Sequence, residues 1–146
     1  MRTIEKTIEV KAGIEAVWTA WTTAEGVTSF SAPEAKIELR LGGAYEWYFM
    51  LDAPEGMKGA EGCTVMAYVP PRLLTFTWNA PPLIPTLRAL GPCSHVVVEL
   101  AEVEGGTAVS VTHVIEGEGA DWDEYLAYFD RAWGIVLKGL GEVFGV

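Results

Sequence analysis

The chain has 146 residues, a length typical of one domain, and its composition excludes several classes of function. Its 20 acidic and 10 basic residues give a formal charge of −10, which disfavours nucleic acid and anionic membranes as partners. No apolar run approaches the roughly 18 residues of a membrane span, and the N-terminus lacks the apolar core of a signal peptide. We therefore expect a single cytoplasmic domain over residues 1–146 that does not insert into membranes.

The cysteines and amides add two further expectations. Cys63 and Cys93 are far apart in sequence and form no CxxC motif, so neither a disulfide framework nor a zinc site is predicted. No other cluster of metal ligands is recognisable, and no glycine-rich segment resembles a phosphate cradle, so we expect no cofactor and no metal. The chain contains no Gln, and Asn79 is its only Asn. This depletion of thermolabile amides is typical of a thermophilic source.

The N-terminal third alternates between the two regular periodicities. Residues 3–10 place Ile4 and Ile8 at even spacing, which predicts a strand. Residues 14–21 then carry apolar side chains at the three- and four-residue steps of a helix, and a second short helical turn is predicted over residues 24–29.

The middle of the chain reads as a series of short strands separated by turns. Alternation predicts strands over residues 36–40, 45–50, 64–69, 73–78, 95–102 and 107–115. Leu41-Gly42-Gly43 predicts a tight hairpin turn, and residues 53–62, with one Pro and three Gly, favour a mobile loop. Residues 79–92 contain four prolines, which exclude a regular sheet strand there.

A single amphipathic stripe ends the chain and predicts a helix over residues 121–144, about 36 Å long. Its apolar members are Trp122, Tyr125, Leu126, Phe129, Trp133, Val136, Leu137, Leu140 and Val143. Asp121 is a suitable N-cap, with Glu124 three residues later as in a capping box. Gly134 in mid-helix indicates a close approach or a bend, whereas Gly139 and Gly141 predict fraying near the end.

The order strand, two short helices, six strands, long helix predicts an α+β protein. An antiparallel sheet with one covered face satisfies the period-two alternation, and the terminal helix is the natural cover. A helix with large aromatics on its inner face leaves either a dense core or a cavity beneath it. With six Trp, five Tyr and five Phe in the chain, we favour the cavity.

Several short motifs, taken together and in this order, resemble a known family. They are Val17-Trp18-Thr19-Ala20-Trp21-Thr22, Leu41-Gly42-Gly43 leading into Tyr45-Glu46-Trp47, Pro70-Pro71-Arg72-Leu73-Leu74-Thr75-Phe76-Thr77-Trp78, Gly105-Gly106-Thr107 with Val111-Thr112-His113, and Trp133-Gly134. Over nearly its whole length the chain resembles the AHSA-type branch of the START-like, SRPBCC superfamily, relatives of the C-terminal domain of the heat-shock chaperone ATPase activator.

This resemblance implies a helix-grip fold, in which a bent antiparallel sheet of six to seven strands wraps around a long C-terminal helix. Two short helices follow the first strand, and an apolar tunnel encloses lipids, polyketides or other hydrophobic ligands. The chain departs from the family at Ser29-Phe30-Ser31, where relatives usually have Trp-Trp or Phe-Trp, and in the proline-rich segment 79–92. We therefore expect a pocket and a mouth of different shape from those of relatives.

Strand and helix parity together predict the ligand-binding residues. They are Trp21, Phe30, Tyr45, Trp47, Phe49, Phe76, Trp78, Val111, His113, Tyr125, Phe129 and Trp133. Each of these side chains could instead belong to an ordinary packed core. His113 shares parity with the inward Val109 and Val111, so it is either a buried neutral imidazole with a structural partner or a polar anchor for ligand. His95 has outward parity and receives no role.

Three functions follow as hypotheses. The first is binding of a small hydrophobic or amphipathic ligand, of lipid, polyketide or aromatic type, between the sheet and the C-terminal helix. The second is an enzyme of the cyclase or hydratase type that uses His113 with a tyrosine, Tyr45 or Tyr125, as acid and base. The third is a protein-interaction module like the chaperone activator. We expect a monomer or a homodimer, with residues 79–92 serving as a lid or as a dimer contact.

Overall fold

The computed structural model describes residues 1–146, all of the chain, and contains seven strands and four helices. In chain order they are β1 (Arg2–Val10), α1 (Ile14–Thr22), α2 (Ala24–Phe30), β2 (Glu34–Ile37), β3 (Tyr45–Tyr48), β4 (Val65–Val69), β5 (Leu73–Trp78), α3 (Pro85–Arg88), β6 (Ser94–Val103), β7 (Gly106–Ile115) and α4 (Ala120–Phe144). The predicted order of elements is confirmed, with the short α3 added inside the proline-rich segment.

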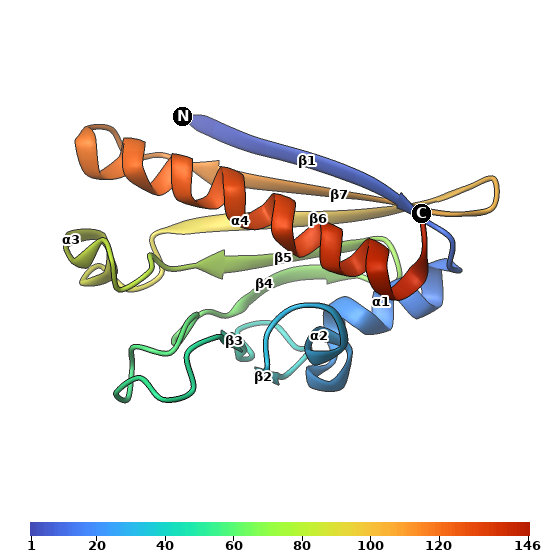
Figure 1. Cartoon of the computed structure of the whole chain (residues 1–146), viewed down its shortest axis with the longest axis horizontal. Helices are drawn as coiled ribbons and strands as arrows, with labels where there is room; N and C mark the ends of the chain where they lie inside the picture. Colours follow the sequence, from blue (N-terminus) through green and yellow to red (C-terminus); the bar gives the residue numbers. More distant parts are fainter.

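Five strands form one antiparallel sheet in the order β1-β7-β6-β5-β4, and β2 pairs with β3 in a separate hairpin. The bridges Ala44↔Thr64 and Tyr48↔Gly59 join the hairpin to the segment before β4. Helix α4 runs across the sheet, and α1 and α2 lie near its C-terminal end (Figure 1). The result is the predicted helix-grip fold, an antiparallel sheet curled around its last helix.

The first hairpin differs from its prediction. Strand β2 ends at Ile37, which pairs with Tyr45, and not at Arg40 as predicted, so residues 38–44 connect the two strands. The predicted tight turn is present within them, because the amide of Gly43 donates to the carbonyl of Arg40 at 2.9 Å and Gly42 has a φ of 75°. The turn also contacts β4, because the amide of Gly42 donates to the carbonyl of Val65 at 2.9 Å. Contact with β4 is thus added to the local turn that the sequence predicts.

The core lies between α4 and the covered face of the sheet. Alternate residues of β7 are buried, as the period-two pattern predicts, and so are the matching residues of β6. The stripe of α4 packs against them with Tyr125, Phe129, Trp133 and Leu140 buried. This burial removes a large apolar area from water and provides the main stabilisation of the fold.

Helix α4 does not begin as predicted. Its N-cap is Gly119, not Asp121, and no side chain caps the helix. Gly119 has a φ of 111°, a conformation that glycine adopts without strain. Asp121 lies within the first turn, where its carboxylate accepts a hydrogen bond from the Thr86 hydroxyl of α3 at 2.5 Å. The acidic group therefore ties α4 to α3 while still favouring the positive end of the helix dipole.

The glycines of α4 also differ from expectation. The helix continues through Gly139 and Gly141 to Phe144, so fraying at these positions is wrong. A Cβ on Gly139 would lie 2.3 Å from the Phe30 carbonyl oxygen, which means that this glycine allows α4 to touch the end of α2. At Gly134 a Cβ would meet no atom within 4 Å, so no close approach explains that residue.

The loop over residues 53–62, predicted to be mobile, is held in its second half by Arg88 of α3. One guanidinium nitrogen donates to the carbonyls of Gly59 (2.9 Å) and Ala80 (2.6 Å). The other donates to the carbonyl of Gly56 and to the Glu61 carboxylate at 3.0 Å. The Arg88 side chain is only 10% exposed, and a buried charge is costly unless it is paired. Glu61 and the loop carbonyls provide that compensation. Charge pairing fixes a loop that its glycines would leave flexible.

None of the four helices combines the length and the apolar character that crossing a membrane requires.

The two glycines give a matched test of this packing. Gly134→Ala should raise the free energy of unfolding by about 1 kcal/mol, because alanine favours helix and its methyl group meets open space. Gly139→Ala should lower it by about 1–3 kcal/mol, because the methyl group would collide with the Phe30 carbonyl and push α2 away. Urea denaturation of both variants measures the difference. Equal effects of the two changes would contradict the close approach of α4 to α2.

Candidate functional site

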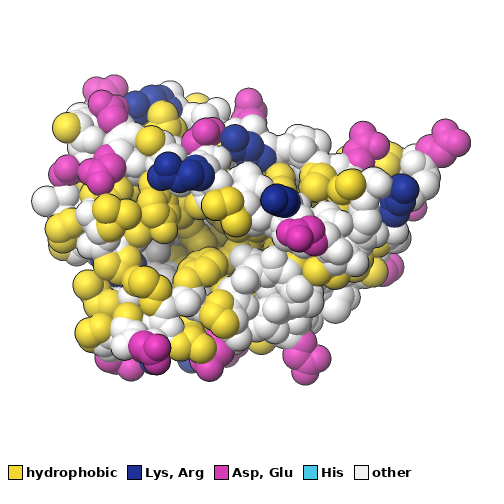
Figure 2. Space-filling model, in the orientation of Figure 1, with side chains coloured by type: hydrophobic (Ala, Val, Ile, Leu, Met, Phe, Trp, Pro, Cys, Tyr) yellow, Lys and Arg dark blue, Asp and Glu magenta, His cyan; other side chains and the backbone are white.

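A cavity of about 480 Å³ opens between α4 and the part of the molecule formed by α2, β3 and the loop that carries Lys58, Gly59 and Ala60. Figure 2 shows it as a hollow in which hydrophobic side chains gather, while charged groups lie on the surface around it. The loop after β5 completes one end with Asn79, Pro81 and Pro82. The space is therefore bounded by five separate segments of the chain.

Three indole rings from three different elements meet at the cavity wall. Trp47 of β3 lies with its ring centroid 5.4 Å from Trp78 of β5 and 6.0 Å from Trp133 of α4. Trp78 and Trp133 are 5.7 Å apart. Because these rings contact one another edge to face or tilted, each restrains the others. Their arrangement gives the cavity one continuous aromatic wall.

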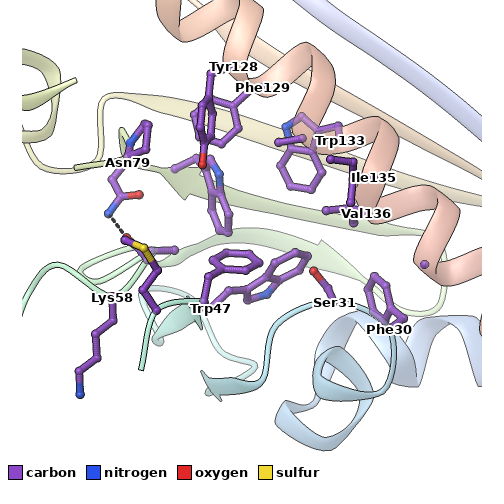
Figure 3. Close-up of a pocket in the computed structure, with 18 of the residues that line it drawn as sticks. Phe30, Ser31, Trp47, Lys58, Asn79, Tyr128, Phe129, Trp133, Ile135 and Val136 are labelled. Atoms are coloured by element: carbon purple, nitrogen blue, oxygen red, sulfur yellow. Dashed lines mark hydrogen bonds between the residues drawn. The ribbon is translucent and has the colours of Figure 1, made fainter. Parts of the chain in front are cut away.

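The remaining wall is also largely apolar, and the cavity opens toward solvent (Figure 2). Phe30 lies at the α2 end, while Tyr128 and Phe129 project from α4 on the opposite side (Figure 3). Phe49 and Ile135 line the space and are 46% and 66% exposed, which places them at the mouth. An apolar interior with an apolar mouth is typical of a site for a poorly soluble molecule.

The structure divides the twelve residues predicted from sequence into two equal groups. Six line the cavity: Phe30, Trp47, Phe49, Trp78, Phe129 and Trp133. The other six are buried outside its lining: Trp21, Tyr45, Phe76, Val111, His113 and Tyr125. Parity identified the covered face of the sheet. The inner residues of β7, however, lie directly under α4, whose side chains fill the space above them. Space remains only beside β3 and beyond the end of β5.

Sequence reasoning missed several lining residues. Ser31, Asn79 and Tyr128 are the uncharged polar members of this group, and Ala132 and Ile135 are apolar members on α4. Ser31 was signalled by the departure at Ser29-Phe30-Ser31, because a smaller residue there leaves room in the wall. Asn79 belongs to the segment 79–92, which was expected to form a lid or a dimer contact, but its parity after the inward-facing Trp78 gave no sign of a lining role. Tyr128 lies off the apolar stripe and had no signal.

His113 lies at the centre of a buried hydrogen-bond chain rather than in the cavity. The indole N–H of Trp133 donates to His113 Nδ1 at 3.0 Å. An accepting Nδ1 leaves the proton of a neutral ring on Nε2, which donates to Ser94 Oγ at 2.7 Å. Ser94 and the Tyr125 hydroxyl are 2.6 Å apart, and Tyr125 donates to the Asn79 carbonyl at 3.1 Å. Both ring nitrogens are thus engaged by protein groups.

Burial, reinforced by the other histidine, His95, lowers the pKa of His113 to about 3. The ring is therefore neutral at physiological pH, as the bonding pattern of its two nitrogens requires. Burial likewise raises the pKa of Tyr125 far above its usual value. The structure places the second predicted acid–base candidate elsewhere, because Tyr45 donates to the Trp21 carbonyl at 2.7 Å and its pKa is also raised by burial.

Both cysteine thiols lie in surroundings that disfavour their ionisation. Both cysteines are free, and burial raises the pKa of Cys63 to about 12, so its reactive thiolate form is disfavoured. Burial also raises the pKa of Cys93. No three His, Cys, Asp or Glu side chains are grouped so as to hold a metal ion.

A curled antiparallel sheet that grips a long C-terminal helix beside an apolar cavity defines a helix-grip protein. The family model described as "Activator of Hsp90 ATPase homolog 1-like protein" matches residues 11–145, so the chain belongs to this family, the AHSA branch of the SRPBCC superfamily. The resemblance noted in the sequence is thereby confirmed.

Solved structures of similar fold extend this assignment. The Aha1 dimer from Colwellia psychrerythraea superposes with a TM-score of 0.75 at 19% identity, covering 100% of this chain and 98% of that one. Protein MLL2253 from Mesorhizobium loti also gives 0.75 at 19% identity, with 97% and 96% covered. CalU16 from Micromonospora echinospora gives 0.71 at 24% identity, with 97% and 75% covered. At these identities the likeness establishes the fold, and no curated protein matches the chain.

The neutral state of His113 has a measurable consequence for stability. Its pKa is about 3 in the folded protein and about 6.5 when unfolded, so below pH 6.5 the unfolded state binds more protons. The stabilisation is therefore complete above pH 6.5 and is lost progressively as pH falls toward 3. We expect the free energy of unfolding to decrease between pH 7 and pH 5, where carboxylates still contribute little.

Denaturation of His113→Gln and His95→Gln at pH 7 and pH 5 separates the two histidines. The decrease should disappear in His113→Gln, whose amide offers both an acceptor to Trp133 and a donor to Ser94. It should persist in His95→Gln, which leaves the hydrogen-bond chain intact. A slope that survives in His113→Gln would contradict the assignment of the buried neutral ring.

Proposed function

We propose that this protein binds a small apolar or amphipathic molecule in the cavity between α4 and the sheet. The supporting observation is a cavity of about 480 Å³ whose walls are mainly aromatic and aliphatic and which opens to solvent. This volume lies within the range of roughly 300–1,000 Å³ typical of small-molecule sites. A ligand that fills it would gain about 25 cal/mol for each Å² of apolar surface removed from water.

Two contacts favour a site that exists before the ligand arrives. Trp133 is held by its hydrogen bond to His113, and Trp47 is held by ring contacts with Trp21, Phe30 and Trp78. Since these side chains lose little freedom on binding, less of the binding energy is spent on ordering them. This arrangement supports a binding role more strongly than an acid–base role for His113, both of whose nitrogens are occupied.

The segment 79–92 would form the mouth of this site rather than a detached lid. Pro81 and Pro82 line the cavity, and Ile84 and Leu87 anchor the segment by being buried. Its remaining large apolar side chains, Leu83 and Leu90, are exposed. The whole chain, residues 1–146, would act as one binding domain, either alone or as a homodimer.

Dye binding to cavity-filling variants tests the proposal. The neutral hydrophobic dye Nile red should bind the folded protein and be displaced by apolar compounds. Ala132→Trp places a large ring in the cavity and should weaken dye binding at least 10-fold, because Ala132 faces the space. Ala127→Trp adds the same ring to the exposed face of the same helix and should leave the affinity unchanged. Fluorescence titration measures both.

Circular dichroism should confirm that each variant is folded before the titrations are compared. Equal dye affinity in a folded Ala132→Trp protein would show that the dye binds elsewhere. Absence of dye binding to the unaltered protein, together with no retained small molecule in native mass spectrometry, would remove the proposed function.

A further inference from the structure

One polar side chain in the cavity wall is buried yet only partly satisfied. Asn79 follows the last residue of β5, is 6% exposed and contributes to the cavity lining. Its amide nitrogen donates to the carbonyls of Gly59 (3.0 Å) and Glu61 (3.2 Å). Its amide oxygen, Oδ1, accepts no hydrogen bond from any protein group. In Figure 3 the nitrogen turns toward the loop, and the oxygen turns toward the space beneath α4.

The orientation of this amide is fixed by its partners. If the amide were rotated by half a turn, Oδ1 would face two carbonyl oxygens and neither carbonyl would receive a proton. One of these two carbonyls is itself held in place, because Arg88 also donates to the Gly59 carbonyl at 2.9 Å. The cavity therefore presents a carbonyl-type oxygen at this position, a group that accepts hydrogen bonds and cannot donate them.

The other polar groups of the lining do not impose the same demand. Ser31 and Tyr128 direct hydroxyl groups toward the space, and neither hydroxyl has a protein partner (Figure 3). A hydroxyl group both donates and accepts, so these two positions tolerate either kind of ligand atom. The indole N–H of Trp47 is sealed from solvent and has no partner, which leaves it out of reach of a ligand.

Charge is nearly absent from the interior. Lys58 and Glu142 are the only charged side chains in the lining, and Glu142 is exposed. The Lys58 side chain extends away from the aromatic rings (Figure 3). The nearby guanidinium of Arg88 is bound to Glu61 and to loop carbonyls, and it does not line the cavity. A ligand carboxylate inside the cavity would thus lose its water without gaining a cation.

We propose that the occupant of this cavity is a neutral aromatic molecule with a hydroxyl or N–H donor that hydrogen-bonds to Asn79 Oδ1. This inference rests on the proposed binding function and specifies its ligand class. An aromatic ring of the ligand would stack on the indole walls of Trp47, Trp78 and Trp133. Its donor would bond to Asn79 Oδ1, which a purely apolar ligand would separate from water without offering a new partner. Fatty acids and other carboxylates are disfavoured by the same wall.

Three probes of similar shape test this chemistry: 2-naphthol, 2-methoxynaphthalene and 2-naphthoate. Only the first is a neutral donor at pH 7, since the second merely accepts and the third is an anion. We expect 2-naphthol to bind about 10-fold more tightly than 2-methoxynaphthalene, the factor that corresponds to one good hydrogen bond at a buried acceptor. The anion 2-naphthoate should bind more weakly than either. Competition with the neutral dye Nile red, or calorimetry, gives the three dissociation constants.

Variants assign the preference to a residue. Asn79→Leu keeps the approximate side-chain volume and removes the hydrogen-bond acceptor. It should therefore abolish the higher affinity for 2-naphthol and leave the affinity for 2-methoxynaphthalene unchanged. Ser31→Ala and Tyr128→Phe each remove a hydroxyl group from the same cavity and should keep the preference. Asn79→Leu also loses two hydrogen bonds to the loop, so this variant could fail to fold. In that case the three probes are compared on the unaltered protein and on the two hydroxyl variants, which gives an independent measurement.

The outcomes separate the two proposals. If all three probes fail to bind, the proposed function fails and the ligand class falls with it. If 2-naphthol and 2-methoxynaphthalene bind equally well, the cavity binds apolar molecules but the role of Asn79 is overturned. Tighter binding of 2-naphthoate, or a preference for 2-naphthol that disappears in Ser31→Ala or Tyr128→Phe, would also overturn it.

Discussion

The relation between α4 and the sheet depends on a single buried chain of hydrogen bonds. It begins at the indole of Trp133, passes through His113 and Ser94, and reaches Tyr125 and the Asn79 carbonyl. These residues come from α4, β7, β6 and the end of β5. A shift of the helix by one turn would leave several of these groups buried without partners, each at a cost of about 1–3 kcal/mol. The apolar stripe alone would not impose such a precise register, because aliphatic contacts are not directional.

The two ends of this chain are both residues of the cavity wall. Trp133 provides an aromatic surface, and Asn79 provides the unpaired oxygen. The C-terminal half of α4 is fixed separately, where Gly139 lets the helix touch the Phe30 carbonyl. Between these two points of contact the helix spans the space beside β3 without filling it. The cavity is thus a consequence of how α4 is attached, which explains why it can stay open although its walls are apolar.

The sequence was most informative where periodicity controls the structure. Alternation placed Tyr45, Trp47 and Trp78 correctly on the covered face, and the stripe of α4 identified the gripping helix. Prediction failed where a distant residue decides the local conformation. Arg88, which follows β5 in the chain, binds the glycine-containing loop that precedes β4. Nothing in the sequence of that loop indicates this partner. At the start of α4, the turn that Gly119 makes displaced a good local capping motif.

Asn79 shows the same limit at the site itself. Strict alternation after the inward Trp78 would place the next residue on the outer face, but β5 ends at Trp78 and both residues contribute to the cavity wall. It is the only asparagine of the chain, in a sequence that contains no glutamine. A side chain amide at this position therefore stands out against the composition of the whole protein. Because an amide does not titrate, the acceptor that Asn79 offers is the same at every physiological pH. The one buried histidine, His113, has a structural role instead, since its hydrogen bonds fix Trp133 in the cavity wall.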